Sequence, residues 1–248
     1  MKHYGITDKG KLREDNQDSF CFRNIVAKNC LIVSLCDGMG GAAAGDLAST
    51  LGCESFTDSV LAVLTCRTEK KPDYEKAVRR GCDDANRTVY EYALIDAAYF
   101  GMGSTLVGAV IDEGGRAVIA NIGDSRCYII RKKEKSIRQI TADHSLVESF
   151  VRAGVISEAE AKVHPKKNII TRALGAEPYV VADVFEEQLK RGDSLLFCSD
   201  GLTNFVEDEE ILKVCLNSPQ PRDICRALID LTLERGAADN VTVISVVR

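Results

Sequence analysis

The chain has 248 residues, of which 45% are hydrophobic and 28% charged, and its formal net charge is −5. This composition is typical of a soluble globular protein, and we take residues 1–248 as a single domain. The acidic balance argues against a nucleic-acid partner. No apolar run reaches membrane-spanning length and the N-terminus lacks a signal-peptide core, so we expect a cytoplasmic protein with no membrane partner.

The ten cysteines support the same compartment. Most of them stand inside apolar stretches, as Cys30, Cys36, Cys198 and Cys215 do, and no CxxC pair occurs. A zinc ribbon or a redox-active pair is therefore not indicated. We expect reduced thiols that act as small core residues in a reducing compartment.

Apolar, β-branched runs bounded by turn residues predict seven strands in chain order. These are residues 19–23, 30–36, 105–111, 116–122, 125–131, 193–198 and 241–247. Helical spacing predicts helices at about 45–64, after Pro72, at 207–216 and at 221–235. Strands and helices do not alternate regularly, which favours an α+β fold: two packed antiparallel sheets flanked by helices.

The segment 145–168 interrupts this strand pattern. It reads as two short helices broken at Gly154 and ended before Pro165. A mobile flap beside a site is one interpretation, and a plain helical connection is the other.

Aspartates stand at the boundaries of four strand-like runs: Asp37, Asp124, Asp200 and Asp239. A carboxylate is a poor strand residue and is costly to bury unpaired. One such boundary is an ordinary turn, but four of them suggest that carboxylates gather at one edge of a sheet.

Hairpin geometry predicts which of these residues meet. If strands 19–23 and 30–36 form a hairpin, Asp18 lies beside Asp37. The same reasoning places Ser104 beside Asp124, and Asp200 beside Asp239. Mg²⁺ and Mn²⁺ prefer such oxygen-rich edges. Glycines at 38 and 201 would let backbone carbonyls approach an ion. Any single Asp-Gly pair is better read as a turn, whereas the whole set favours a metal site.

The motifs match a known family. In chain order they are Thr7-Asp8-Lys9-Gly10, Arg13-Glu14-Asp15-Asn16-Gln17-Asp18, Asp37-Gly38-Met39-Gly40-Gly41, Gly101-Met102-Gly103-Ser104-Thr105, Asn121-Ile122-Gly123-Asp124-Ser125-Arg126, Thr141-Ala142-Asp143-His144-Ser145, Ile170-Thr171-Arg172-Ala173-Leu174-Gly175, Gly192-Asp193, Cys198-Ser199-Asp200-Gly201-Leu202 and Asp239-Asn240-Val241-Thr242. The chain resembles the PP2C-type (PPM) metal-dependent serine/threonine protein phosphatases, and their compact bacterial members most. Any one of these motifs alone would be weak.

The resemblance implies the same α-β-β-α sandwich and a set of roles. Asp37, Asp200 and Asp239 match direct ligands of two Mn²⁺ or Mg²⁺ ions, with Asp37 bridging them. Gly38 matches the residue that offers its carbonyl, and Asp18 the one that holds metal-bound water.

The resemblance extends to a third ion and to the substrate. Asp124, with Asp200, matches a third, weaker metal site of bacterial relatives. Arg13 matches the arginine that grips the substrate phosphate, and a guanidinium fork suits those oxygens. From spacing alone, a surface ion pair of Arg13 with Glu14 or Asp15 would be the expectation. Ser104 and Thr105 are candidates for supporting polar groups, or ordinary strand-start hydroxyls.

The chain departs from the family pattern at two positions. Met39 stands where many eukaryotic relatives carry a histidine proposed as general acid, so any acid here must be another group. Gln17 stands where other members carry glutamate, which removes one charge beside Asp18. We assign no catalytic role to His144 or His164.

The leading hypothesis is hydrolysis of phosphoserine and phosphothreonine in proteins by water activated at a binuclear Mn²⁺ or Mg²⁺ centre. The expected partners are substrates of a serine/threonine kinase of the same cell, in a signalling role, and we expect a monomer. A non-catalytic pseudophosphatase acting as a binding module is the alternative, disfavoured because Asp18, Asp37, Asp200 and Asp239 all remain. A carboxylate-dependent nuclease is a third, which the acidic charge opposes.

Overall fold

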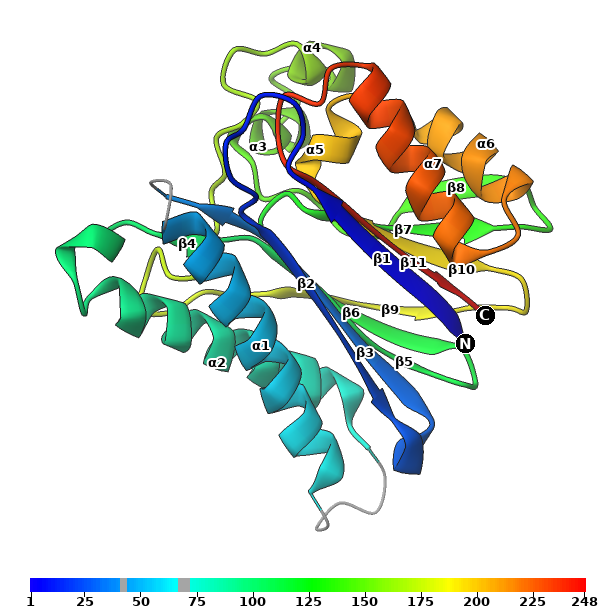
Figure 1. The fold of residues 1–248 in the computed structure, drawn as a ribbon, viewed down its shortest axis with the longest axis horizontal. Coiled ribbons are helices and arrows are strands. Elements are labelled where there is room, and N and C mark those ends of the chain that lie inside the picture. The colour runs from blue at the N-terminus through cyan, green and yellow to red at the C-terminus, as the bar shows by residue number, and fades with distance from the viewer. Residues whose placement is uncertain (41–43, 67–71) are drawn as a thin grey trace.

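The computed structural model describes residues 1–40, 44–66 and 72–248 of the chain. It contains two antiparallel sheets packed face to face, with helices on both outer faces (Figure 1). The α+β sandwich expected from the element order is confirmed. Gly41, the last residue of the motif that begins at Asp37, lies outside the described residues.

The first sheet has the strand order β1-β11-β10-β7-β8. These strands are β1 (Lys2–Asp8), β11 (Val241–Val247), β10 (Ser194–Cys198), β7 (Arg126–Arg131) and β8 (Ser136–Gln139). The outer face of this sheet is covered by α5 (Asp200–Thr203), α6 (Asp208–Asn217) and α7 (Pro221–Glu234) (Figure 1).

The second sheet has the order β2-β3-β5-β6-β9, with the short β4 paired to β3. Its strands are β2 (Asp18–Ile25), β3 (Cys30–Met39), β4 (Gly103–Ser104), β5 (Leu106–Asp112), β6 (Arg116–Ile122) and β9 (Asp183–Gln188). The long helices α1 (Ala44–Thr65) and α2 (Tyr74–Ala93) pack on its outer face. Single 3-10 turns occur at η1 (Val26–Lys28) and η2 (Ala97–Tyr99).

Three apolar clusters follow from this layering. Leu31, Val107 and Phe197 belong to the cluster between the sheets, and α1 and α2 close a second cluster with the second sheet. The third lies between the first sheet and α5 to α7. Cysteines such as Cys36 and Cys198 are buried in these clusters, as expected for core thiols. No helix in the described part of the chain is long and apolar enough to cross a membrane.

The predicted strand at 105–111 corresponds to β5, but its first residue, Thr105, instead lies in the break between β4 and β5. Thr105 uses its backbone N–H to donate to the Asp37 carbonyl, and its hydroxyl accepts from the Asp37 N–H. The interruption therefore places a hydroxyl against the strand that carries Asp37.

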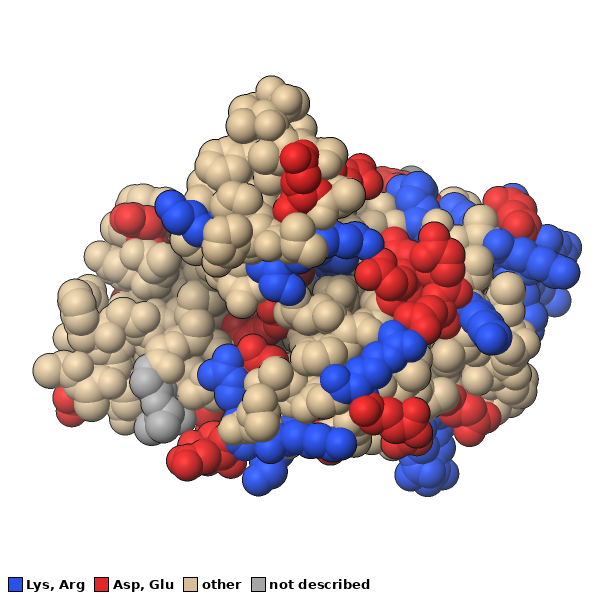
Figure 2. Space-filling model, turned by 90° about the horizontal axis from the view of Figure 1, so that it is seen from above, with Lys and Arg blue, Asp and Glu red and all other residues tan. Residues whose placement is uncertain are grey.

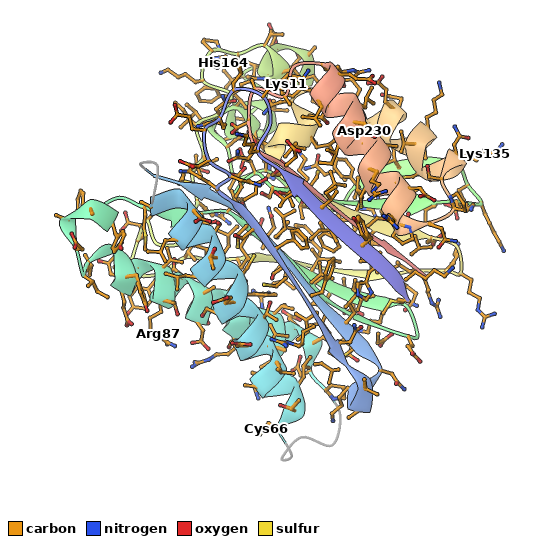
Figure 3. The ribbon with its side chains drawn as sticks, viewed as in Figure 1. Lys11, Cys66, Arg87, Lys135, His164 and Asp230 are labelled. Carbon is orange, nitrogen blue, oxygen red and sulfur yellow. The ribbon has the colours of Figure 1, made fainter. Side chains whose placement is uncertain are left out.

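The segment 145–168 contains the two predicted short helices, α3 (Leu146–Arg152) and α4 (Glu158–Lys162). Ser145, at its start, forms a bridge with Ile170, just after its end. The segment therefore leaves the rest of the domain and returns to it at one place. Its labelled residue His164 and the loop residue Lys11 lie at the same end of the molecule, opposite Cys66 (Figure 3).

Candidate metal centre

Strand pairing brings the predicted aspartates to one edge of the sandwich. β2 and β3 pair antiparallel, and their register sets Asp18 directly opposite Asp37. In the other sheet, Cys198 pairs with Val243, so Asp200 after β10 and Asp239 before β11 emerge at the same end. The predicted hairpin relationships are confirmed. Figure 2 shows acidic side chains inside a hollow on the upper face, with basic side chains at its border.

The carboxylate of Asp37 lies at the centre of this group. It interacts electrostatically with Asp18, Asp200, Asp124 and Asp239, so all five belong to one cluster. Its backbone is held by β4 and by the residue that follows it, since the Ser104 hydroxyl donates to the Asp37 carbonyl at 2.9 Å and the Thr105 hydroxyl accepts from the Asp37 N–H at 2.9 Å. Of the two roles that the sequence left open for Ser104 and Thr105, the structure shows that of supporting polar groups.

Two glycines allow the close approach of backbone to backbone at this edge. A Cβ on Gly38 would lie 2.0 Å from the Gly45 carbonyl oxygen, and one on Gly201 would lie 1.9 Å from the Asn240 carbonyl oxygen. Neither neighbour is a flexible side chain, so only glycine fits. The glycine after Asp37 and the one after Asp200 therefore fix how tightly β3, α1 and β11 come together.

The protein environment disfavours negative charge on these carboxylates. Burial, followed by repulsion from Asp18 and Asp200, raises the pKa of Asp37 well above its ordinary value. Burial raises the pKa of Asp124 to about 7, with a contribution from Asp200. The pKa of Asp200 is raised as well, by burial and then by Asp239. A cluster of this kind requires protons or a bound cation.

Asp18 is the most enclosed member of the set. Its Oδ2 accepts hydrogen bonds from the Ser199 hydroxyl at 2.8 Å and the Thr242 hydroxyl at 2.6 Å. Its Oδ1 is buried and has no hydrogen-bond partner among the described residues. Burial raises the pKa of Asp18 to about 7, although the two hydroxyls oppose the shift. An orphaned, buried carboxylate oxygen is unusual and fits a partner such as an ion or ion-bound water.

The carboxylates fit a hard cation that keeps part of its water. Within the described residues, no three His, Cys, Asp or Glu side chains stand close enough to enclose an ion by themselves. Mg²⁺ and Mn²⁺ do not require such a cage, because they retain several waters and use one or two carboxylates each. The oxygen-only donor set, the raised pKa values and the orphaned Asp18 oxygen all agree with that mode of binding.

Arg13 extends over the same cluster from the loop between β1 and β2. Its Nη2 donates to Asp239 Oδ2 at 2.8 Å, and the guanidinium also interacts electrostatically with Asp37 and Asp200. The local ion pair with Glu14 or Asp15 that spacing alone would favour is not what the structure shows. The long-range partner places a half-exposed cation at the carboxylate edge, where an anionic substrate can reach it.

Known proteins resemble this chain in sequence and in fold. A profile of the protein phosphatase 2C family matches residues 13–228. The chain belongs to the protein phosphatase 2C family. A serine/threonine phosphatase, Stp, from Listeria monocytogenes is 39% identical over 249 residues, covering 98% of this chain and 94% of the relative.

Solved structures of relatives share the fold of this family member. The crystal structure of the serine/threonine phosphatase Stp1 from Staphylococcus aureus superposes with a TM-score of 0.90 at 36% identity, covering 99% of this chain and 94% of that one. The catalytic domain of the phosphatase PstP, solved with two manganese ions, has a TM-score of 0.82 at 32% identity, covering 98% and 96%. The resemblance seen in the motifs is confirmed.

Sequence reasoning missed several residues that build this edge. Ser199 and Thr242 support Asp18, and Asn240 makes three hydrogen bonds to the loop that carries Arg13. All three stand inside segments that matched the family motifs, next to the aspartates. Their position was the available signal, but their partners are nearly the whole chain length away and cannot be read from spacing.

Proposed function

We propose that this protein is a metal-dependent serine/threonine phosphatase that hydrolyses phosphoserine and phosphothreonine in proteins. The observation that carries the proposal is the carboxylate cluster around Asp37, with raised pKa values and with Arg13 against its rim. Membership of the protein phosphatase 2C family and the names of the relatives support the same reaction.

In this proposal Asp37, Asp200, Asp239 and the Gly38 carbonyl hold two Mn²⁺ or Mg²⁺ ions, and Asp18 orients water bound to them. Asp124 and Asp200 form the weaker third site. Ions bound there would neutralise the phosphate dianion and lower the pKa of a water nucleophile, which carboxylates alone cannot do. The two-manganese structure of a relative supports the count.

Arg13 is proposed to bind the substrate phosphate. The phosphate dianion is repelled by unneutralised carboxylates, so a cation at the rim is needed to orient it. Arg13 is 54% exposed and its guanidinium has donors beyond the one directed at Asp239. The guanidinium can therefore reach an arriving phosphate without moving its backbone.

Phosphopeptide hydrolysis measured with and without metal tests the function. Activity should require Mn²⁺ or Mg²⁺ and should collapse in Asp37→Ala, because the ion then lacks its shared ligand. If the wild-type protein is equally active with metal and in excess chelator, the proposal is wrong. Unchanged activity of Asp37→Ala would refute only the assignment of Asp37 as a metal ligand.

The segment 145–168 is proposed to be a flap that shapes access to this site. Contacts with the α5–α6 region support the proposal: Lys167 Nζ donates to Asn204 Oδ1 at 2.9 Å, and Asn204 Nδ2 donates to Asp200 Oδ2 at 3.0 Å. Lys162 also pairs with Glu207. Through Asn204, the flap contacts a proposed metal ligand.

Shortening the flap between Ser145 and Ile170, which already form a bridge, tests this role. Turnover of a phosphoprotein should fall much more than turnover of a small aryl phosphate, since only the large substrate contacts the flap. An equal fall for both substrates would identify the segment as a structural element instead.

The expected partners are phosphoproteins made by a serine/threonine kinase of the same cell, and we propose a cytoplasmic monomer. The buried cysteine thiols fit a reducing compartment. Size-exclusion chromatography with light scattering tests the monomer, and a dimer mass would refute it.

A further inference from the structure

The loop between β1 and β2 carries Arg13 but has little support of its own. Residues 11–15 are all exposed, and the loop packs no large apolar side chain into a core; Leu12 is 73% exposed. A loop of this kind is positioned by its backbone hydrogen bonds rather than by burial. The place of the Arg13 guanidinium therefore depends on what holds the backbone on either side of it.

A single buried amide supplies three of the hydrogen bonds that hold this backbone. Asn240 is 5% exposed, and its Nδ2 donates to the carbonyl oxygens of Lys9 and Asp15, each at 2.9 Å. Its Oδ1 accepts the Gln17 N–H at 2.9 Å. The three bonded groups flank Arg13 on both sides, and further bonds run from the Lys11 N–H to the Ala237 carbonyl and from Asn16 Nδ2 to the Thr7 hydroxyl.

The same amide connects the loop to the carboxylate edge. Asn240 follows Asp239 directly, and its own N–H donates to Asp239 Oδ1 at 2.8 Å. On the other side, the Gln17 carbonyl accepts the Gly38 N–H at 3.0 Å. Asn240 is thus bonded to Asp239 through its own N–H and to Gln17 through its side chain, and Gln17 is in turn bonded to Gly38.

We propose that Asn240 is a positioning residue for phosphate binding, whose amide holds the loop 9–17 so that Arg13 faces the carboxylate cluster. The inference rests on the proposed phosphatase activity and assigns a role beyond it: Asn240 acts through Arg13 and contacts neither substrate nor ion. Only an amide can serve, because the site presents two acceptors and one donor to a single side chain.

The decisive variant is Asn240→Asp, which keeps the shape. It preserves the acceptor for Gln17 but turns a carboxylate oxygen toward the carbonyls of Lys9 and Asp15, which repels the loop. We expect the kcat/KM for a phosphopeptide to fall by about 10- to 100-fold, and inorganic phosphate to inhibit more weakly in the same proportion.

A double-mutant cycle with Arg13→Ala separates positioning from general damage. Once the guanidinium is absent, the position of the loop no longer affects phosphate binding, so Asn240→Asp should cost little more in that background. Fully additive losses would overturn the proposal, because they would mean that Asn240 acts through the fold or the ions instead.

The chain contains a matched control in Asn86. This residue is 2% exposed, and its side chain makes the same pattern of three hydrogen bonds with other partners. It donates to the carbonyls of Glu177 and Pro178 and accepts from the Gly175 N–H. It holds a loop beside α2. Asn86→Asp should lose stability to a similar extent while leaving phosphate inhibition unchanged, and its effect should be additive with Arg13→Ala.

Hydrogen exchange provides a readout independent of turnover. Asn240→Asp should increase amide exchange across residues 9–17, and Asn86→Asp should not. If Asn240→Asp does not fold, Asn240→Ser replaces it, with the same expected coupling to Arg13→Ala. Absence of hydrolysis by the wild-type protein would reject the proposed function, whereas an active wild type without coupling would reject only the role of Asn240.

Discussion

The aspartates at the two ends of β10 have opposite environments. Asp193, just before the strand, is 2% exposed, and its Oδ2 accepts from Arg131 Nη1 at 2.8 Å and from the Lys190 N–H at 2.9 Å. Asp200, just after it, belongs to the carboxylate cluster, where burial and then Asp239 raise its pKa while Arg126 opposes the shift. The same strand thus has an ion-paired aspartate at its start, whereas the aspartate after its end forms no ion pair within the described residues.

Asp18 and Asp193 sharpen the comparison because they are buried almost equally, at 5% and 2% exposure. Asp193 has an arginine partner, while Asp18 is held by two hydroxyls and forms no ion pair within the described residues. A buried, ionised carboxylate without a nearby cation destabilises the folded state, and a bound cation removes this penalty. The difference supports the proposal that an ion binds at the end that carries Asp18, whereas the protein itself neutralises Asp193 at the other end.

The largest expected effect separates the two ends by activity. Asp37→Asn should reduce the phosphopeptide kcat/KM by about 1000-fold or more, since losing a shared ligand removes several kcal/mol of transition-state stabilisation. Asp193→Asn is the control and should retain activity per folded molecule. Comparable losses in both variants would show that the two ends do not differ in function.

The next effect separates them by stability. Arg131→Met leaves Asp193 and Glu187 without their shared guanidinium, and breaking a buried pair costs about 3 kcal/mol in the free energy of unfolding. Urea denaturation measures it. Lys132→Met, at the exposed neighbouring position, should change the free energy of unfolding by no more than about 0.5 kcal/mol.

Mn²⁺ should stabilise the folded protein by binding at the acidic end, and not at the end that carries Asp193. A ligand that binds only the folded state at 100 times its Kd adds about 2.7 kcal/mol, which appears as a higher Tm. Asp193→Asn should show the same upward shift of Tm with Mn²⁺ as the wild type. The shift of Tm should disappear in Asp37→Asn. If the shift persists in that variant, Mn²⁺ binds at a site that does not include Asp37.

The smallest effect is a pH dependence of the metal-free protein. The pKa of Asp18 is raised to about 7 from an ordinary 3.8, so the folded state binds a proton more tightly than the unfolded state. The free energy of unfolding should therefore fall as pH rises from about 4 to about 7, and remain low above that. Thermal melts across this range test it, and Asp18→Asn should make the slope shallower, while Asp37, Asp124 and Asp200, whose pKa values are also raised, retain the rest.

The interior strands of both sheets were predictable from sequence, whereas β2 was the one edge strand that was predicted, at 19–23. The strand at 116–122 was predicted with the bounds it has in the structure, because a buried β-branched run is a strong signal. The unpredicted strands β1, β8 and β9 are all edge strands with partly exposed residues along their length. Such strands need no continuous apolar run, since one side faces solvent.

The sequence predicted which residues belong to the candidate site, but not which residues they form hydrogen bonds and ion pairs with. Antiparallel pairing requires that residues flanking a hairpin meet, which is why sequence positions alone pair Asp18 with Asp37. The partner of Arg13 could not be found that way, because Asp239 is 226 positions away. The short helix α5, which begins at Asp200, was also missed, since four residues carry no periodic pattern.

The sequence by itself determined the family, the interior strands and the residues that gather at the carboxylate edge, because motifs and hairpin geometry are local properties. Only the tertiary structure decided which aspartates receive an arginine and which do not. Asp193 and Asp200 both stand at an end of one strand, yet their charges are balanced by residues that folding brings from elsewhere in the chain. Electrostatic free energy depends on distance in space, and that distance is set by the fold.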